Sequence, residues 1–294
     1  MSRSSDPGVF PGALLGGRYR LVRELAAGSM GAVWSALDVR GEEDAPGAAA
    51  DREVAVKLLR PEFDFDPSIR RRFRREASIL RSLSHPAIVR VLGVSEAESE
   101  RSYTVMELLR GETLEALLDR LGPVEPTTVV APLSVLCDGL EAVHQHGVVH
   151  GDIKPANLFW TTDDPCPVRI VDFGLSKIEG LERLTRTGEL TGTPAYMAPE
   201  LLKGGATLDG RIDQYALGVV LYQALAGQPP FTLRKHPGAL VLDIVMGRGV
   251  PLEQTAPGVP AAVRAVIARA MAPRPEDRFA SMSELGLAFQ EACR

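Results

Sequence analysis

The sequence predicts an α+β fold of two lobes, a small β-rich lobe with one long helix followed by a larger, mainly helical lobe. Short, Val-rich apolar runs broken by Gly fill residues 19–59, which is typical of strands joined by turns. Helical periodicity dominates from Leu114 onward, and the composition changes between Leu109 and Gly111. The chain has 294 residues, 45% of them hydrophobic, which is enough for two lobes of ordinary domain size.

The first lobe begins after residues 1–18, which contain Ser, Pro and Gly in no periodic pattern and which we expect to form a flexible tail. The acidic, Ala- and Gly-rich stretch from Asp38 to Glu53 predicts a loop between two strands. Apolar residues at helical spacing predict an amphipathic helix over Pro67–Ser82. Two further strands, Ile88–Val94 and Tyr103–Glu107, complete this lobe.

We expect the β-rich lobe to cover residues 19–108 and the helical lobe residues 109–294, with a single domain over about residues 19–289. The most apolar run of the chain, Tyr215–Gly227, is interrupted by Gln223 and is shorter than the roughly 20 residues that cross a bilayer. We interpret it as a buried helix. The N-terminus lacks a basic cluster followed by an apolar core, so the sequence predicts a cytoplasmic protein without a membrane span.

Charge and cysteine content exclude several classes of protein. Subtracting 38 acidic from 33 basic side chains leaves a net charge of −5, which provides no overall attraction to nucleic acid or to an acidic membrane. Three widely spaced cysteines without a CxxC pair indicate neither a disulfide framework nor a zinc site. An arginine cluster on the helix predicted over Pro67–Ser82 favours a solvated face, with partner binding as the alternative; it consists of Arg70, Arg71, Arg72, Arg74 and Arg75.

The first two strands are joined by a turn in which Gly28 and Gly31 would allow backbone N–H groups to approach phosphate oxygens. A hairpin with two turn glycines explains the same pattern equally well. Lys57 lies inside an alternating strand, where a lysine is either at the surface or beside an anion. Glu76, on the helix that follows, could pair with Lys57 and direct its ammonium group to the α- and β-phosphates of a nucleotide.

The strongest signal is the segment from His150 to Asn157, followed by the triplet that begins at Asp172. Phosphoryl transfer needs a carboxylate that accepts the proton of the attacking hydroxyl, a cation near the moving phosphate, and oxygen ligands for magnesium. Asp152 supplies the carboxylate and Lys154 the cation. Asn157 and Asp172 supply the oxygen ligands. Capping or turn residues could look similar, but the ordered spacing favours a phosphotransferase.

These motifs resemble those of the protein kinase superfamily, and from about Tyr19 to Phe289 the chain is similar to eukaryotic-like (Hanks-type) bacterial Ser/Thr kinases. The resemblance implies a bilobal protein-kinase fold and transfer of the ATP γ-phosphoryl group to protein Ser or Thr hydroxyls, including those of the kinase itself. Magnesium or manganese would be required. Asp152 matches the catalytic base, and Lys154 the residue that stabilises the transferring group and marks a Ser/Thr-type loop. Asn157 and Asp172 match the metal ligands.

The resemblance also implies an ATP site. Lys57 and Glu76 match the ion pair at the phosphates, and Met106 matches the gatekeeper beside the adenine. The remaining positions match the phosphate loop, the apolar slots around the adenine ring or the backbone groups that bind it; they are Ala27, Gly28, Ser29, Gly31, Val33, Ala55, Glu107, Leu109 and Leu158.

Downstream, the segment from Gly192 to Glu200 resembles the substrate-docking loop of the kinases and its A-P-E anchor. Glu200 matches a residue that pairs with a late arginine, and Arg278 fits that partner. Asp213 matches an aspartate that steadies the catalytic loop through backbone N–H groups. Candidate phosphorylation sites lie ahead of the docking loop, at Thr185, Thr187 and Thr191.

Two positions depart from the family pattern. Ala26 replaces the first glycine of the phosphate loop, and we expect a slightly raised KM for ATP without loss of activity. Gly151 stands where many kinases have an arginine that binds a phosphorylated activation-loop residue. Lys177 matches a secondary basic contact of this kind. We therefore expect activation-loop phosphorylation not to be obligatory.

Two alternative functions remain. H-G-D followed five residues later by Asn also occurs in kinases of aminoglycosides and choline, but these lack the combination of Lys154, the docking loop and its anchor. A catalytically weak scaffold predicts loss of key residues, and all of these are present: Lys57, Asp152, Asn157 and Asp172. The sequence therefore favours a protein Ser/Thr kinase, and it identifies neither the substrate, nor the activating signal, nor whether the chain forms a homodimer.

Overall fold

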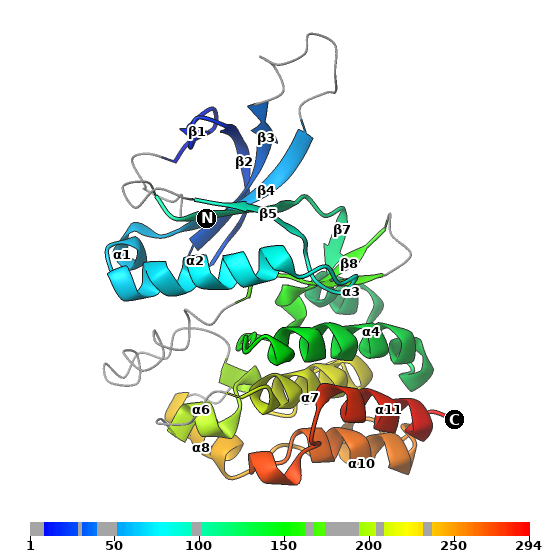
Figure 1. The fold of residues 1–294 in the computed structure, drawn as a ribbon. Helices are drawn as coiled ribbons and strands as arrows, with labels where there is room; N and C mark the ends of the chain where they lie inside the picture. Colours follow the sequence, from blue (N-terminus) through cyan, green and yellow to red (C-terminus); the bar gives the residue numbers. More distant parts are fainter. Residues whose placement is uncertain are drawn as a thin grey trace. The chain divides into compact units, whose positions relative to one another are not determined.

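The computed structural model describes residues 9–28, 31–39, 52–95, 101–162, 167–173, 194–203, 209–231 and 237–294. The chain divides into two compact units (Figure 1). Unit 1 comprises Met1–Ser84 and Val89–Leu109, and unit 2 comprises His85–Ile88 and Arg110–Arg294. Unit 1 is mainly a β-sheet with one long helix and unit 2 is mainly helical, which confirms the predicted α+β class.

Unit 1 is built on a six-stranded antiparallel sheet with the strand order β1-β2-β3-β4-β6-β5. Val54, Val56 and Leu58 alternate along β4 and pack with Trp34 and Val105 in the core of the unit. The opposite face of β4 therefore carries the residues between them. The strands are β1 (Leu14–Leu15), β2 (Tyr19–Ala27), β3 (Gly31–Asp38), β4 (Arg52–Leu59), β5 (Val91–Val94) and β6 (Tyr103–Glu107).

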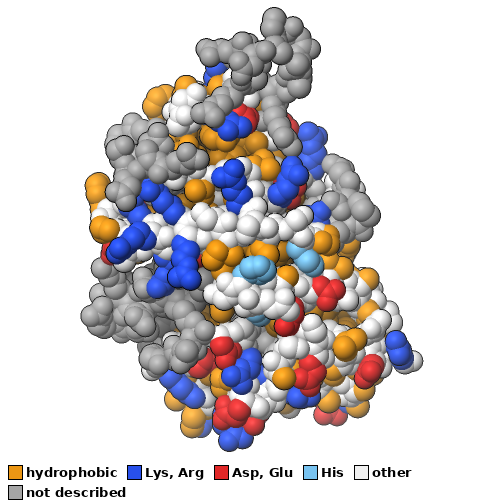
Figure 2. Space-filling view, in the orientation of Figure 1, with side chains coloured by type: hydrophobic (Ala, Val, Ile, Leu, Met, Phe, Trp, Pro, Cys, Tyr) orange, Lys and Arg blue, Asp and Glu red, His pale blue; other side chains and the backbone are white. Residues whose placement is uncertain are grey.

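The helix α2 has the bounds that the sequence predicts, Pro67–Ser82, and follows a short helix α1 (Pro61–Asp64). It begins where the Asp66 carboxylate accepts a hydrogen bond from the Ser68 N–H at 2.9 Å. Its buried face packs against β5, whereas Arg71 and Arg75 are exposed. Lys and Arg side chains accordingly lie at the surface over α2 in Figure 2.

Two stretches of unit 1 differ from the sequence-based expectation. Residues 9–18 contain β1, and Val9 is buried in the core, so this part of the expected flexible tail has defined contacts. The strand expected over Ile88–Val94 begins only at Val91, and Ile88 belongs to unit 2, where it forms an isolated parallel bridge with Ile170. Both contacts join segments that are distant in the sequence, so local periodicity could not indicate them.

Unit 2 combines a small antiparallel sheet of order β7-β8-β9 with a helical body. In that body α4 packs against α11, and α10 packs against both α7 and α11 (Figure 1). The strands are β7 (Gly111–Thr113), β8 (Leu158–Thr161) and β9 (Val168–Ile170). The helices are α3 (Leu114–Leu121), α4 (Pro126–Gln145), α6 (Pro199–Lys203), α7 (Arg211–Ala226), α8 (Pro237–Val245), α9 (Leu252–Thr255), α10 (Ala261–Ala270) and α11 (Met282–Ala292). The described part of unit 2 also contains the short 3-10 turns η2 (Pro155–Asn157), η3 (Pro194–Tyr196) and η4 (Pro275–Asp277).

The helix α7 is the central element of unit 2 and contains most of the apolar run that the sequence assigns to a buried helix. This assignment is confirmed, since Tyr215, Val219 and Leu225 are each at most 4% exposed. Gly227, in the left-handed conformation, ends the helix and donates to the Gln223 carbonyl. Among the described residues, none of the helices combines the length and the hydropathy that a membrane-crossing segment needs.

A buried ion pair joins α6 to the segment before α11, as the sequence predicts. Arg278 donates to both carboxylate oxygens of Glu200 at 2.7 and 2.8 Å. The same guanidinium donates to the carbonyls of Arg211 and Ala272, at 2.7 and 2.9 Å. Because the Arg278 side chain is 0% exposed, this set of acceptors replaces the water it loses on folding.

We expect Glu200→Ala to lower the free energy of unfolding by roughly 3–5 kcal/mol, because it leaves the Arg278 charge buried without its carboxylate. Urea unfolding followed by circular dichroism measures this change. Arg274→Ala is the matched control, because its ion pair with Asp277 is exposed and contributes about 0–1 kcal/mol. Equal losses in the two variants would contradict the assignment of Glu200 as a buried anchor.

Candidate active site

The Asp213 carboxylate, in the first turn of α7, holds the segment that precedes Asp152. It accepts hydrogen bonds from the backbone N–H groups of His150 at 2.8 Å and Gly151 at 2.7 Å. His144 of α4 contacts it through Nε2 at 2.8 Å. Asp213 is 0% exposed, and these donors replace its hydration. The role predicted for Asp213 in steadying this loop is confirmed.

His150 continues this hydrogen-bond network toward the strand end before Asp172. Its Nε2 faces the Val171 carbonyl at 3.0 Å, and its Nδ1 faces the Asp152 N–H at 3.2 Å. A carbonyl can only accept and an N–H can only donate, so Nε2 carries the proton and Nδ1 accepts. Complete burial lowers the pKa of His150, which keeps the ring neutral in this arrangement. Phe173 packs on the ring with a centroid distance of 4.6 Å.

Asp152, Lys154 and Asn157 form one cluster of side chains. The Lys154 ammonium lies 3.0 Å from Oδ2 of Asp152. The Asn157 amide nitrogen donates to the same Oδ2 and to the Asp152 backbone carbonyl, both at 2.7 Å. The Asp152 side chain is 18% exposed, so its carboxylate is held by these donors and is still accessible to solvent. Such a carboxylate can act as a proton acceptor with a defined orientation.

The donor set around Asn157 and Asp172 fits a hard divalent cation. Because both acceptors on Asp152 face the amide nitrogen of Asn157, the amide oxygen of Asn157 points away from Asp152. The Asn157 carbonyl accepts the Val171 N–H at 3.0 Å, which ties the residue before Asp172 to the same loop. Amide and carboxylate oxygens are the ligands that magnesium and manganese prefer. Asp172 has φ of 59°, a conformation that Asp adopts more readily than most residues.

Gly151 has φ of 72°, in the left-handed region. Its N–H must point at Asp213 while the chain turns to present Asp152, and glycine adopts this conformation without a Cβ penalty. The backbone thus supplies a local reason for glycine at this position. The sequence indicated only the arginine side chain that glycine lacks.

In unit 1 the structure brings four of the predicted ATP-contacting residues onto one face of the sheet. Val33 is directly opposite Lys57 across β3 and β4, and Ala55 is directly opposite Met106 across β4 and β6. Paired residues point to the same side, and Ala55 and Lys57 are two apart on one strand. This is the face of β4 opposite Val54, Val56 and Leu58. Glu76 lies on the buried face of α2 at 7% exposure.

The turn glycines have a structural role that the sequence did not separate from a phosphate-binding role. A Cβ on Gly31 would lie 2.1 Å from the Leu58 carbonyl oxygen, so only glycine lets β3 approach β4 this closely. The Gly28 N–H donates to the Gly31 carbonyl at 2.8 Å and closes the turn after Ala27 at the end of β2. The Glu107 N–H donates to the Arg90 carbonyl at 3.0 Å, so it does not donate to a nucleotide base. Leu109 lies just after the end of β6. The remaining predicted residues lie outside the part of the chain that the structure describes: Ser29, Lys177, Thr185, Thr187 and Thr191, with Gly192 and Thr193 at the start of the predicted docking loop.

The structure contradicts the assignment of Leu158 to the adenine site. Leu158 is 0% exposed and, with Trp160, faces a cavity among the helices of unit 2. Phe159 lies between them on β8, is only half-buried and points to the opposite side of the strand. The period of two in a strand makes a shift by one residue a change of face, so Phe159 is the neighbouring residue of β8 that faces away from this cavity.

Comparison with known proteins agrees with this arrangement. Residues 19–285 match the protein kinase domain family. The chain is 38% identical over 279 residues to the serine/threonine-protein kinase PknH of Mycobacterium bovis, covering 94% of the chain and 44% of that protein. It is 36% identical to PknB of Mycolicibacterium smegmatis, covering 92% of the chain and 42% of that protein. The crystal structure of the Mycobacterium tuberculosis PknI kinase domain is similar with a TM-score of 0.73 at 30% identity, covering 97% of this chain and 98% of that one.

The chain belongs to the protein kinase domain family, and it has the protein-kinase fold of a curled β-sheet unit and a helical unit. Its curated relatives are bacterial serine/threonine kinases. The chain spans less than half the length of those two relatives.

We expect Gly151→Ala to destabilise the protein by about 1–2 kcal/mol, because an L-residue pays that cost in the left-handed conformation. Chemical unfolding with urea measures the loss. Gly238→Ala is the control: Gly238 lies in the first turn of α8 without a positive φ, and a Cβ there meets nothing within 4 Å. The control should be neutral or slightly stabilised, and an unchanged Gly151→Ala protein would contradict the assigned backbone role.

Proposed function

We propose that this chain is a serine/threonine protein kinase that transfers the γ-phosphoryl group of ATP to Ser or Thr hydroxyls of proteins, its own included. The observation that carries the proposal is the Asp152 carboxylate, oriented by Lys154 and Asn157 on a loop anchored through Asp213. A protein Ser or Thr acceptor is further supported by the names of the curated relatives and by the family match.

In this mechanism Asp152 accepts the proton of the acceptor hydroxyl as its oxygen attacks the γ-phosphorus, and the bond between that phosphorus and the β–γ bridging oxygen breaks to release ADP. Lys154, 3.0 Å from the Asp152 carboxylate, is close enough to place its positive charge beside the transferring phosphoryl group. Asn157 holds Asp152 through its amide nitrogen, and its amide oxygen with the Asp172 carboxylate would hold the metal ion. A bound magnesium or manganese ion would neutralise part of the negative charge on the phosphates. Positioning and electrostatics are therefore the main catalytic contributions.

Unit 1 would bind the nucleotide with the face that carries Val33, Ala55, Lys57 and Met106. Lys57, aligned by Glu76, would contact the α- and β-phosphates. The backbone of the turn from Ala27 to Gly31, Ser29 included, would cover the phosphates, while the Glu107 carbonyl and the Leu109 backbone would bind the adenine. Phe159 replaces Leu158 as the residue of β8 that we assign to the adenine ring.

The partner we propose is a protein substrate and not a nucleic acid, in keeping with the net charge of −5. The kinase domain would act in the cytoplasm, where ATP is supplied. Formation of a homodimer is a further proposal, which sedimentation of the purified chain would decide.

We expect Asp152→Asn to lower the rate of phosphate transfer by about 100- to 10,000-fold, the usual contribution of a general base. The assay incubates the purified chain with labelled ATP and magnesium, a generic basic protein as acceptor, and an aminoalcohol in a parallel reaction. Asp119→Asn, on the exposed face of α3, is the control and should leave the rate unchanged. Label in the aminoalcohol but not in protein would transfer the assignment to a small-molecule kinase, and no label at all would indicate a scaffold.

Because of Gly151, we also propose a variant of the family in which activation-loop phosphorylation is not obligatory. The glycine offers no side chain to a phosphorylated Thr185, Thr187 or Thr191, whatever weaker contact Lys177 makes. A chain with all three threonines changed to Ala should keep its kcat within about a factor of three, since no ordering charge is lost. Abolished transfer in a triple variant that unfolds at the wild-type urea concentration would refute this proposal.

A further inference from the structure

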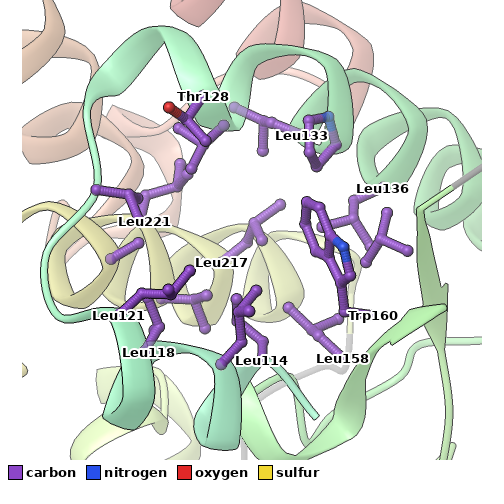
Figure 3. A pocket seen from close by; sticks show the side chains of 17 residues that line it. Leu114, Leu118, Leu121, Thr128, Leu133, Leu136, Leu158, Trp160, Leu217 and Leu221 are labelled. Atoms are coloured by element: carbon purple, nitrogen blue, oxygen red, sulfur yellow. The ribbon is translucent and has the colours of Figure 1, made fainter. Parts of the chain in front are cut away.

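Apolar side chains from α3, α4, α7 and β8 enclose a cavity of about 210 Å³ within unit 2. Figure 3 shows these side chains pointing from separate elements toward a common open space. Part of its wall belongs to the buried core of unit 2, since Leu133, Leu158 and Leu217 are each at most 2% exposed. Of the side chains in the wall, only those of Thr128 and Trp160 carry a polar atom.

The cavity reaches the surface between the end of α3 and the start of α4. Leu121, the last residue of α3, is 56% exposed, and Thr128 in the first turn of α4 is also exposed. The connection between these helices is tied to α7 by a hydrogen bond from the Val124 N–H to the Ala224 carbonyl at 2.8 Å. A ligand could therefore enter at a rim whose backbone is already held in place.

The size and lining of the cavity select the class of ligand. An apolar cavity of about 150 Å³ stays dry and accepts benzene, so this larger space has room for a second fused ring. A buried water needs two to four polar partners, which two polar side chains at separate elements do not provide. Because the wall contains no charged side chain, an ionised group placed inside would lose its hydration without compensation.

One backbone acceptor lies near the polar side of this space. Pro132, inside α4, has no N–H, so the Thr128 carbonyl does not receive the hydrogen bond that residue 132 normally donates in a helix. Pro132 and Thr128 both contribute to the cavity wall. A ring compound with a single N–H or O–H could donate to this carbonyl while its rings fill the apolar part.

We propose that this cavity is a binding site for an uncharged bicyclic aromatic ligand with one hydrogen-bond donor. Filling the space restores the dispersion contacts that the surrounding leucines lack. Leu158 in the wall directly follows Asn157, whose amide holds Asp152, so a bound ligand also stabilises the start of β8 beside the catalytic loop. Binding itself does not depend on the proposed function.

Indole is the probe, and its charged relative indole-3-acetate is the ligand control. At about five times its Kd, indole should raise the Tm of the purified chain by about 2–4 °C, and indole-3-acetate should not. Ala224→Leu extends a side chain from α7 into the cavity and should abolish the rise. Ala265→Leu makes the same change at an exposed position of α10 and should keep it.

A second measurement uses the wild-type chain, and therefore applies even where Ala224→Leu fails to fold. Methyl NMR should show nuclear Overhauser contacts from the indole ring to Leu118 and Leu221 in the wall, and none to the exposed Leu242 and Leu287. The site is ruled out by an unchanged Tm at the solubility limit of indole, by an equal rise in Ala224→Leu, or by contacts confined to the exposed leucines.

Discussion

The arrangement of the active-site loop depends on one buried carboxylate. Asp213 is fully enclosed at the start of α7, so its charge is tolerated only because donors from two other segments face it. The positive end of the α7 dipole favours the same charge. By binding two successive backbone N–H groups, Asp213 determines the path of the chain into Asp152. The neutral His150 ring then transmits this order to Val171, so the loop and the segment before Asp172 form one hydrogen-bonded unit.

Backbone conformation is the second constraint on this site. Gly151 and Asp172 both adopt positive φ, one on each side of the hydrogen-bonded network. At Gly151 the residue type removes the strain, whereas at Asp172 the strain is held by the surrounding contacts, as is common for functional residues. The sequence resemblance predicts that Gly151 replaces an arginine. The geometry gives glycine a separate role, because it relieves the turn that presents Asp152.

Local pattern predicted those elements whose signal lies within one segment. Helical spacing of apolar residues specified the bounds of α2, and apolar composition identified α7 as buried. Prediction was wrong where a contact joins distant segments. Val9 enters the core of unit 1, and Ile88 pairs with Ile170, and a contact between distant segments leaves no signal in the local pattern of either one. Leu158 was misassigned because a sequence match does not show which way a strand residue faces.

For this protein the sequence by itself determined which chemical groups are present and their order: the proposed base, the proposed cation and the two proposed oxygen ligands are recognisable because their spacing is local and their chemistry is particular to phosphoryl transfer. The tertiary structure alone decided which partners hold those groups. It placed the Asn157 amide nitrogen on Asp152, buried Leu158 in unit 2, and left a cavity between α3, α4 and α7. These outcomes depend on side-chain direction and on packing between elements far apart in the chain, and neither is encoded in any single segment.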